Sequence, residues 1–296
     1  MVDGRQAATA AYHRPKHWDQ VHHSAGSEVT GRAWRSLHSS AMTAVTGCMP
    51  PGGTVLDLAC GTGGLLRRLP AGHRGVGMDF SAGALRHAVD DDATGGLAWV
   101  RGDAHQLPLA TGSCDAVVCL AGLWVFADPA RVLAEAHRVL RPGGALVAQL
   151  WASPGDCRLI TLGAVAIGRV VPAARLTEGV TGPFELSPDQ VGAWARSVGF
   201  GSVNWRSARY RCGVADVDAY WAEFAALAPT AYDRYVRATA AERRRVRGLL
   251  AALLHRYAGE PGGRDGQRSP ELSLTWRLGV ARRGGAGDAP PRAVSA

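Results

Sequence analysis

The sequence lacks any run of about 18 apolar residues, the length that a membrane-crossing helix needs. Residues 1–6 also lack the basic-then-apolar order of a secretory signal. We therefore expect a cytoplasmic protein with no membrane partner. At 296 residues and 47% hydrophobic content, the chain is long and apolar enough to bury a substantial core.

Cysteine spacing typical of metal sites is missing as well. The six cysteines form no C-x-x-C pair and do not group with histidines. Structural zinc sites and disulfide frameworks normally show such spacing. The sequence therefore predicts no metal site, and we expect reduced cysteines of which several are buried.

Acidic residues are outnumbered by basic ones, which gives the chain a net charge of +8. Nucleic acid is the first partner to consider for such a chain. The basic residues are overwhelmingly arginine and are spread along the sequence, with one local run from Arg243 to Arg247. Because a run of this kind on a helix is usually a solvated face, a nucleic-acid partner is disfavoured.

Short apolar runs alternate with helical segments in the first half of the chain. The apolar runs cover residues 54–60, 74–79, 97–103, 114–121 and 145–151, and the helical segments cover residues 64–69, 82–90 and 129–140. This alternation is typical of parallel β-α-β units with right-handed crossovers. We therefore expect an α/β fold with an open sheet that is covered on both faces.

The remaining segments are placed around this core by their breakers and composition. Ser187 and Pro188 predict the N-cap and first position of a helix. The expected divisions are an N-terminal helical cap (1–50), the α/β core (51–152), a lid insertion (153–186) with a loop over 172–183, further core (187–214), one or two helices (215–258), the last strand (259–283) and a disordered tail (284–296).

The strongest local signal is an apolar strand that runs into a glycine turn and then a helix. Asp57 lies inside this strand, and Gly61 and Gly63 lie in the turn. Ligands of open α/β sheets bind at the carboxyl ends of strands, where glycine lets a cofactor approach the backbone. The turn does not match the G-x-G-x-x-G pattern of nicotinamide enzymes.

Two further acidic residues end neighbouring strands. Asp79 follows the glycines by about 20 residues, the spacing of a carboxylate that binds ribose hydroxyls. Asp103 ends the third strand and can accept a hydrogen bond from an exocyclic amine such as that of adenine, while Phe80 can cover a base. Taken singly, Asp79 is equally well explained as a helix N-cap and Asp103 as a turn residue. Together with the glycine turn they favour a cofactor site.

Five motifs follow one another in the chain: VLDLACGTG at 55–63, GMD at 77–79, GDAHQLP at 102–108, CDAVV at 114–118 and RVLRPGG at 138–144. This ordered set resembles the class I S-adenosylmethionine-dependent methyltransferases of the ubiquinone/menaquinone-biosynthesis type. The resemblance covers about 100 residues and implies a doubly wound, Rossmann-like sheet of seven mostly parallel strands, with an antiparallel last strand and a helical lid.

The resemblance also implies S-adenosylmethionine as the cofactor and assigns residues to it. Asp57 would order the glycine loop near the cofactor's amino group, Asp79 would hold the ribose hydroxyls, and Asp103 would meet the adenine amine. The remaining cofactor contacts would be Ala59, Gly61, Gly63, Ala104, Leu120 and Ala121. Trp124 would lie at the mouth of the transfer site, and the stretch from Tyr12 to Trp18 would fold over the cofactor.

One position departs from the family pattern. Ala59 stands where many relatives have glycine. A methyl group is tolerable there if the backbone φ of Ala59 is negative, and it crowds the loop otherwise.

Methyl transfer from a sulfonium requires few reactive side chains, because the leaving group is neutral and the protein contributes alignment and removal of water. A hydroxyl or carbon acceptor would benefit from a general base. The paired His22 and His23 are the first candidates, although adjacent histidines in a loop are more often solvated. Other candidates are Tyr12, His13, His17 and His137, of which His137 lies mid-helix, where a structural role is expected.

The acceptor is expected to be a small, partly hydrophobic molecule that is methylated on O, N or C. The sequence after the fourth strand is CLAG rather than the Asn/Asp-Pro-Pro-aromatic motif of nucleobase amino methyltransferases. Trp221, Phe224, Tyr232 and Tyr235 either line a pocket or, more commonly for such aromatics, pack in a core. RNA methylation and a non-methylating reaction on the same fold are the alternatives, and a homodimer is left open.

Overall fold

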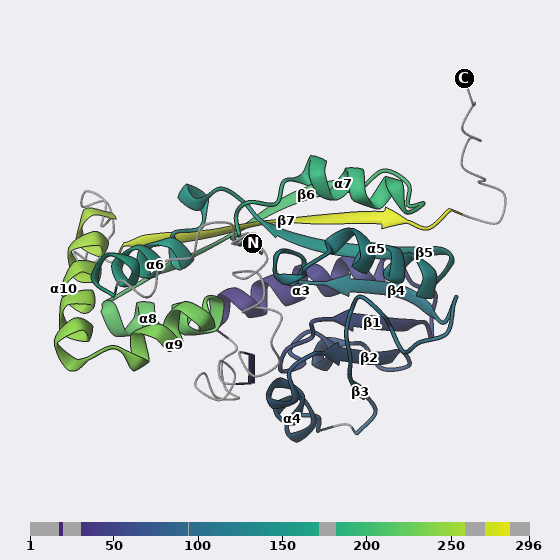
Figure 1. Ribbon diagram of the computed structural model, residues 1–296, viewed down its shortest axis with the longest axis horizontal. Helices are drawn as coiled ribbons and strands as arrows, with labels where there is room; N and C mark the ends of the chain where they lie inside the picture. The colour runs from purple at the N-terminus through teal and green to yellow at the C-terminus, as the bar shows by residue number, and fades with distance from the viewer. Residues whose placement is uncertain (1–17, 20–30, 94, 172–181, 258–269, 285–296) are drawn as a thin grey trace, which may run out of the picture.

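The computed structural model describes residues 18–19, 31–93, 95–171, 182–257 and 270–284 (Figure 1). Within these residues, seven strands form one sheet in the order β3-β2-β1-β4-β5-β7-β6. The strands are β1 Thr54–Leu58, β2 Arg74–Asp79, β3 Ala98–Arg101, β4 Cys114–Cys119, β5 Leu140–Trp151, β6 Asn204–Gly213 and β7 Glu271–Arg282.

The helices precede, connect and follow these strands. They are α3 Arg32–Thr46, α4 Ala82–Asp90, α5 Pro129–Val139, α6 Arg158–Val170, α7 Pro188–Ser197, α8 Val217–Leu227, α9 Pro229–Arg237 and α10 Ala240–Tyr257, with single 3₁₀ turns η1 Leu66–Arg68, η2 Leu123–Val125 and η3 Pro154–Asp156. None of these helices is long and apolar enough to cross a membrane. Residues 1–17, most of the segment predicted as a loop (172–181) and nearly all of the segment predicted as a disordered tail (285–296) lie outside the described residues.

The sheet has the predicted mixed topology. Strands β1 to β5 pair in parallel, whereas β7 runs antiparallel to both β5 and β6. Successive residues of β1 face opposite sides, so Val55 packs in the hydrophobic core with α3 and Leu56 packs in the core with α5 and α7. The prediction of a doubly wound, mostly parallel seven-stranded sheet is confirmed.

Helices α6, α8, α9 and α10 gather at the far end of the antiparallel β6–β7 pair, away from β1, β2 and β3 (Figure 1). Inside this lobe, the Trp221 ring stacks on Tyr235 with ring centres 4.6 Å apart, and it contacts Phe224 and Tyr232. These four aromatic side chains form part of the hydrophobic core of the lobe.

Two predicted helical segments differ from the structure. Residues 64–69 form only the single turn η1, because Pro70 follows at once and leaves no room for further turns. Residues 215–258 form three helices rather than one or two. Pro229 occupies the first turn of α9, and Thr239 starts α10 with a capping box, in which Glu242 N donates to Thr239 Oγ1 while the Glu242 carboxylate accepts from Thr239 N.

Two of the five motifs stabilise the central sheet rather than line the ligand site. The Asp115 carboxylate of the CDAVV motif accepts from Thr54 N at 2.7 Å and pairs with Arg141 of the RVLRPGG motif. These contacts tie the start of β1 to β4 and β5. Burial raises the pKa of Asp115, but the Arg141 guanidinium and the Thr54 N–H outweigh it and lower the pKa below its ordinary value.

Candidate cofactor and methyl-transfer site

A cavity of about 490 Å³ lies at the carboxyl ends of the first four strands. Its wall includes Asp57, the glycine loop, Asp79 and Phe80 after β2, Asp103 and Ala104 after β3, and Leu120 and Ala121 after β4. The three aspartates therefore converge on one cavity, as parallel strands with short loops require. The volume is in the range of small-molecule sites.

Asp79 organises the glycine loop through both of its carboxylate oxygens. Oδ2 accepts from Gly61 N at 2.8 Å, and Oδ1 accepts from Ser81 N at 2.8 Å. Gly61 adopts a φ of 54°, which favours glycine because it has no Cβ. The strand end of β2 and the loop after β1 are thus held together by one carboxylate.

Asp57 is almost fully buried beside Asp79, with 3% of the residue exposed. Burial and the neighbouring negative charge raise the pKa of the Asp57 carboxyl well above its ordinary value. In the ligand-free protein, ionisation of this carboxyl is therefore unfavourable. A cationic group in the cavity would stabilise the charged form.

We predict that Asp57→Asn stabilises the ligand-free protein. The raised pKa means that the folded protein holds a proton on Asp57 that the unfolded chain releases. The contribution of Asp57 to stability is therefore fully present below the ordinary pKa of aspartate and is lost as pH rises above it. Asparagine removes this loss. The free energy of unfolding at pH 8 should rise by about 1–2 kcal/mol, and the difference should vanish near about pH 4.

Urea denaturation between pH 4 and pH 8 measures this difference. Asp115→Asn is the matched control, because the pKa of that buried carboxyl is lowered and its replacement should destabilise the protein at pH 8. Equal stability of wild type and Asp57→Asn at pH 8 would contradict the prediction.

Ala59 adopts a φ of 56°, so the condition of a negative φ at this position is not met. The left-handed conformation brings the alanine Cβ close to the following carbonyl, at a cost of about 1 kcal/mol relative to glycine. Ala59 lies in the cavity wall. The loop therefore keeps the left-handed conformation that glycine favours, and the backbone of Ala59 is strained.

We expect Ala59→Gly to raise the free energy of unfolding by about 1 kcal/mol, because glycine adopts this φ without strain. Thermal and urea denaturation measure the change. Ala136→Gly, in the middle of α5, is the control and should lower stability by more than about 1 kcal/mol, because it loses helix propensity and a buried methyl group. A destabilised Ala59→Gly variant would show that the methyl group contributes packing that outweighs the strain.

The end of the cavity next to β3 contains a histidine, His105, that was not predicted from the sequence. His105 Nδ1 lies 2.6 Å from Asp103 Oδ1, and His105 Nε2 accepts from Asp128 N at 3.2 Å, which assigns the ring proton to Nδ1. Burial raises the pKa of Asp103, but the hydrogen bonds from His105 lower it below its ordinary value. The position of this histidine in the GDAHQLP motif, two residues after Asp103, was the available signal.

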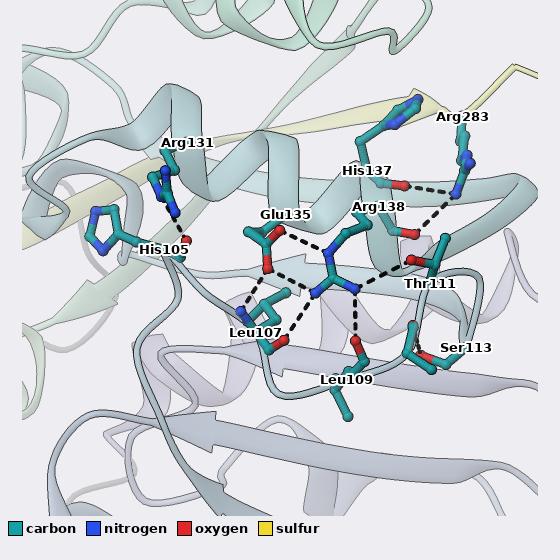
Figure 2. Close-up of polar contacts among 11 residues, drawn as sticks. His105, Leu107, Leu109, Thr111, Ser113, Arg131, Glu135, His137, Arg138 and Arg283 are labelled. Carbon is teal, nitrogen blue, oxygen red and sulfur yellow. Dashed lines mark hydrogen bonds and ion pairs between the residues drawn. The ribbon is translucent and has the colours of Figure 1, made fainter.

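Helix α5 holds the loop that carries Asp103 and His105 (Figure 2). Glu135 accepts from Leu107 N at 2.7 Å, and Arg138 donates to the carbonyls of Leu107 and Leu109. Arg131 Nε donates to the carbonyl of His105 at 2.9 Å. Arg138, the first residue of the RVLRPGG motif, therefore contributes to the site indirectly, by holding this loop in place.

Gly63 is the one glycine-loop candidate outside the cavity wall. Its φ is 79°, and a Cβ there would lie 2.4 Å from the Trp99 ring. This glycine allows the loop to pack on β3. His137 likewise lies away from the cavity, with its ring edge-on to Phe200 at 5.0 Å.

The N-terminal candidates are only partly described. Trp18 lies in the cavity wall, and the neighbouring Asp19 accepts from Ser81 Oγ and Gly83 N at the start of α4, both at 2.8 Å. Tyr12, His22 and His23 lie outside the described residues, as do His13 and His17.

The remaining wall comes from segments far apart in the sequence. Trp34 and His38 of α3 face residues 225–227 of α8 and Pro229, while Trp124, Val125 and Phe126 follow β4. Trp34 Nε1 donates to the Ala226 carbonyl at 2.7 Å, which joins α3 to the helical lobe. Sequence reasoning selected only Trp124 from this set, because nothing in the local pattern marks contacts between α3 and α8.

Comparison with known proteins agrees with this arrangement. The family model described as methyltransferase domain matches residues 56–148. A demethylmenaquinone methyltransferase from Renibacterium salmoninarum is 34% identical over 187 residues, which is 60% of this chain and 76% of the relative. One from Beutenbergia cavernae is 32% identical and covers 61% of this chain and 75% of the relative.

Solved structures show the same fold. A [4+2]-cyclase, SpnF, matches with a TM-score of 0.53 at 20% identity and covers 88% of this chain and 86% of its own. A phosphoethanolamine N-methyltransferase of Haemonchus contortus, solved with phosphomonomethylethanolamine and S-adenosylhomocysteine, matches with a TM-score of 0.51 at 15% identity over 84% of this chain and 52% of its own.

The sheet order and the glycine loop define a class I methyltransferase fold, with the ligand cavity at the strand ends. The relatives make the assignment specific. The chain belongs to the S-adenosylmethionine-dependent methyltransferases of the ubiquinone/menaquinone-biosynthesis type, and it is an enzyme that uses S-adenosylmethionine as its cofactor.

Proposed function

We propose that this enzyme methylates a small, partly hydrophobic molecule that binds where the cavity meets α3, α8 and η2. The supporting observation is the composition of that end of the wall. Trp34, Trp124, Phe126, Leu227 and Pro229 present apolar surface to the cavity. An apolar, aromatic wall matches a flat or hydrophobic acceptor better than a charged polymer.

The cofactor is proposed to run along the strand ends in the order adenine, ribose, methionine. Asp103 and Ala104 bind the edge of the adenine and Phe80 covers its face. The Asp79 carboxylate accepts hydrogen bonds from the ribose hydroxyls. Asp79 already accepts two backbone hydrogen bonds, but each carboxylate oxygen has a second lone pair for a ligand. The cofactor supplies an electrophilic methyl group on a sulfonium.

The methionine portion is proposed to lie against the glycine loop and the β4 end. Asp57 pairs with the ammonium group. The methionine side of the cofactor is lined by Ala59, Gly61, Leu120 and Ala121. The raised pKa of Asp57 fits this role, because a bound cation would favour the carboxylate that burial disfavours. The protein's contribution to the transfer is alignment and exclusion of water.

The relatives support a quinone-like acceptor, since both are named demethylmenaquinone methyltransferases. By contrast, two of the five arginines of α10 make contacts within the protein rather than being available to RNA. Arg247 pairs with Asp218 through two contacts of 2.7 and 2.9 Å, and Arg243 donates to the Val236 and Ala238 carbonyls. Helix α10 also lies at the end of the lobe farthest from the first three strands (Figure 1).

Methyl transfer to a panel of acceptors tests the proposal. Purified enzyme is incubated with S-adenosylmethionine and either reduced short-chain naphthoquinones, other phenols and small amines, or structured RNA, and S-adenosylhomocysteine formation is measured. The proposal expects turnover with an aromatic small molecule and none with RNA. Turnover with RNA alone would contradict it, and cofactor binding without any transfer would favour a non-methylating reaction.

A further inference from the structure

His38 is a buried histidine that neither the motifs nor the residue assignments above use. It lies one helical turn after Trp34 on α3, with ring centres 5.2 Å apart, and it lines the cavity. Its Nδ1 is buried and has no hydrogen-bond partner. The other ring nitrogen, Nε2, is therefore the atom available to a ligand in the cavity.

The surroundings of His38 determine which form of the ring is present. Burial, together with the positive charges of Arg68 and Arg67, lowers the pKa of His38 to about 4. The ring is therefore neutral at physiological pH. A buried N–H without an acceptor costs more than a buried lone pair on a ring nitrogen, so the proton belongs on Nε2 and the ring can donate into the cavity.

The charges along the cavity leave one part of the cofactor without a partner. Asp57, Asp79 and Asp103 match the ammonium, the ribose hydroxyls and the adenine amine. Among the described residues of the wall, Arg131 is the only one with a permanent positive charge, and its Nε donates to the His105 carbonyl beside Asp103. The methionine carboxylate, at the opposite end, still requires a donor.

We propose that His38 binds the methionine carboxylate of the cofactor through Nε2–H. Gly64 and Leu65 of the loop line the cavity with His38, so the ring stands where the glycine loop passes into η1. The positive charges of Arg67 and Arg68, which follow on η1, favour an anion at the same place. This inference depends on the cofactor orientation proposed above.

Two nucleosides that differ in the amino-acid portion test this role. S-Adenosylhomocysteine carries the carboxylate, whereas methylthioadenosine has the same adenosine and thioether without it. Isothermal titration calorimetry should show that His38→Leu weakens S-adenosylhomocysteine about 10-fold and leaves methylthioadenosine unchanged. His38→Gln, which keeps an N–H donor, should recover most of the lost affinity.

His73→Leu is the matched control, because His73 also has a buried Nδ1 without a partner but does not line the cavity. Both leucine variants are checked for folding by thermal denaturation. Equal weakening of the two nucleosides by His38→Leu, or unchanged affinity for S-adenosylhomocysteine, would overturn the role of His38 alone. Failure of the wild type to bind either nucleoside would overturn the cofactor placement itself.

Discussion

Asp79→Ala is expected to lower the affinity for S-adenosylhomocysteine about 100-fold. Alanine removes the acceptor of the Gly61 and Ser81 N–H groups together with the proposed acceptor of the ribose hydroxyls. Hydrogen bonds to a carboxylate contribute about 1.5–3 kcal/mol each, and about 1.4 kcal/mol corresponds to tenfold in affinity. The variant therefore loses both the shape of the loop and the ribose contact.

Calorimetric titration measures this affinity, with thermal denaturation to check that the variant folds. Asp79→Asn keeps the size of the side chain and one acceptor oxygen, so we expect a smaller loss of about tenfold. Asp90→Ala, on the exposed end of α4, should bind like wild type. Comparable affinity of Asp79→Ala and wild type would mean that the ribose is not held at the end of β2.

Glu223→Ala is expected to lower the free energy of unfolding by about 3 kcal/mol. Helix α3 has no capping side chain of its own at Gly31. Glu223 of α8 supplies the acceptors instead, for Arg32 N at 3.2 Å, Ala33 N at 3.1 Å and Arg32 Nε at 3.0 Å, while only 6% of its side chain is exposed. A carboxylate at a helix N-terminus also interacts favourably with the helix dipole.

Urea denaturation of Glu223→Ala and Glu242→Ala gives the comparison. Glu242 has a similar capping role at the start of α10, but it is exposed and acts within its own helix. Its removal should lower the free energy of unfolding by less than the removal of Glu223. A loss for Glu223→Ala no larger than that for Glu242→Ala would show that the contact between α3 and α8 contributes little to folding.

Most of the cofactor end of the cavity was predictable from sequence, since its residues lie within short motifs at strand ends. Asp57, Asp79 and Asp103 belong to consecutive parallel strands, and parallel strands joined by short loops bring their carboxyl ends together. Ala59 shows the limit of this reasoning. The sequence identified the substitution of glycine, but the sign of φ depends on how the loop is held by Asp79 and Trp99.

The acceptor end could not be predicted in the same way. Trp34 on α3 precedes the first strand, and the facing residues 225–227 of α8 lie about 190 positions later. No local periodicity encodes a contact between two such helices, and the alanines among them carry no chemical signal. The aromatic residues that did stand out in the sequence, Trp221 and Tyr235, stack on each other inside the lobe.

The sequence alone determined the class of fold, the cofactor and the aspartates that meet it, because hydrophobic periodicity and loop chemistry act over short separations in the chain. Tertiary structure decided which side chains enclose the methyl-transfer end of the cavity and which motif residues stabilise the sheet. It also determines that His38 is neutral. Those properties depend on burial and on charges brought together from distant segments, and both arise only when the chain has folded.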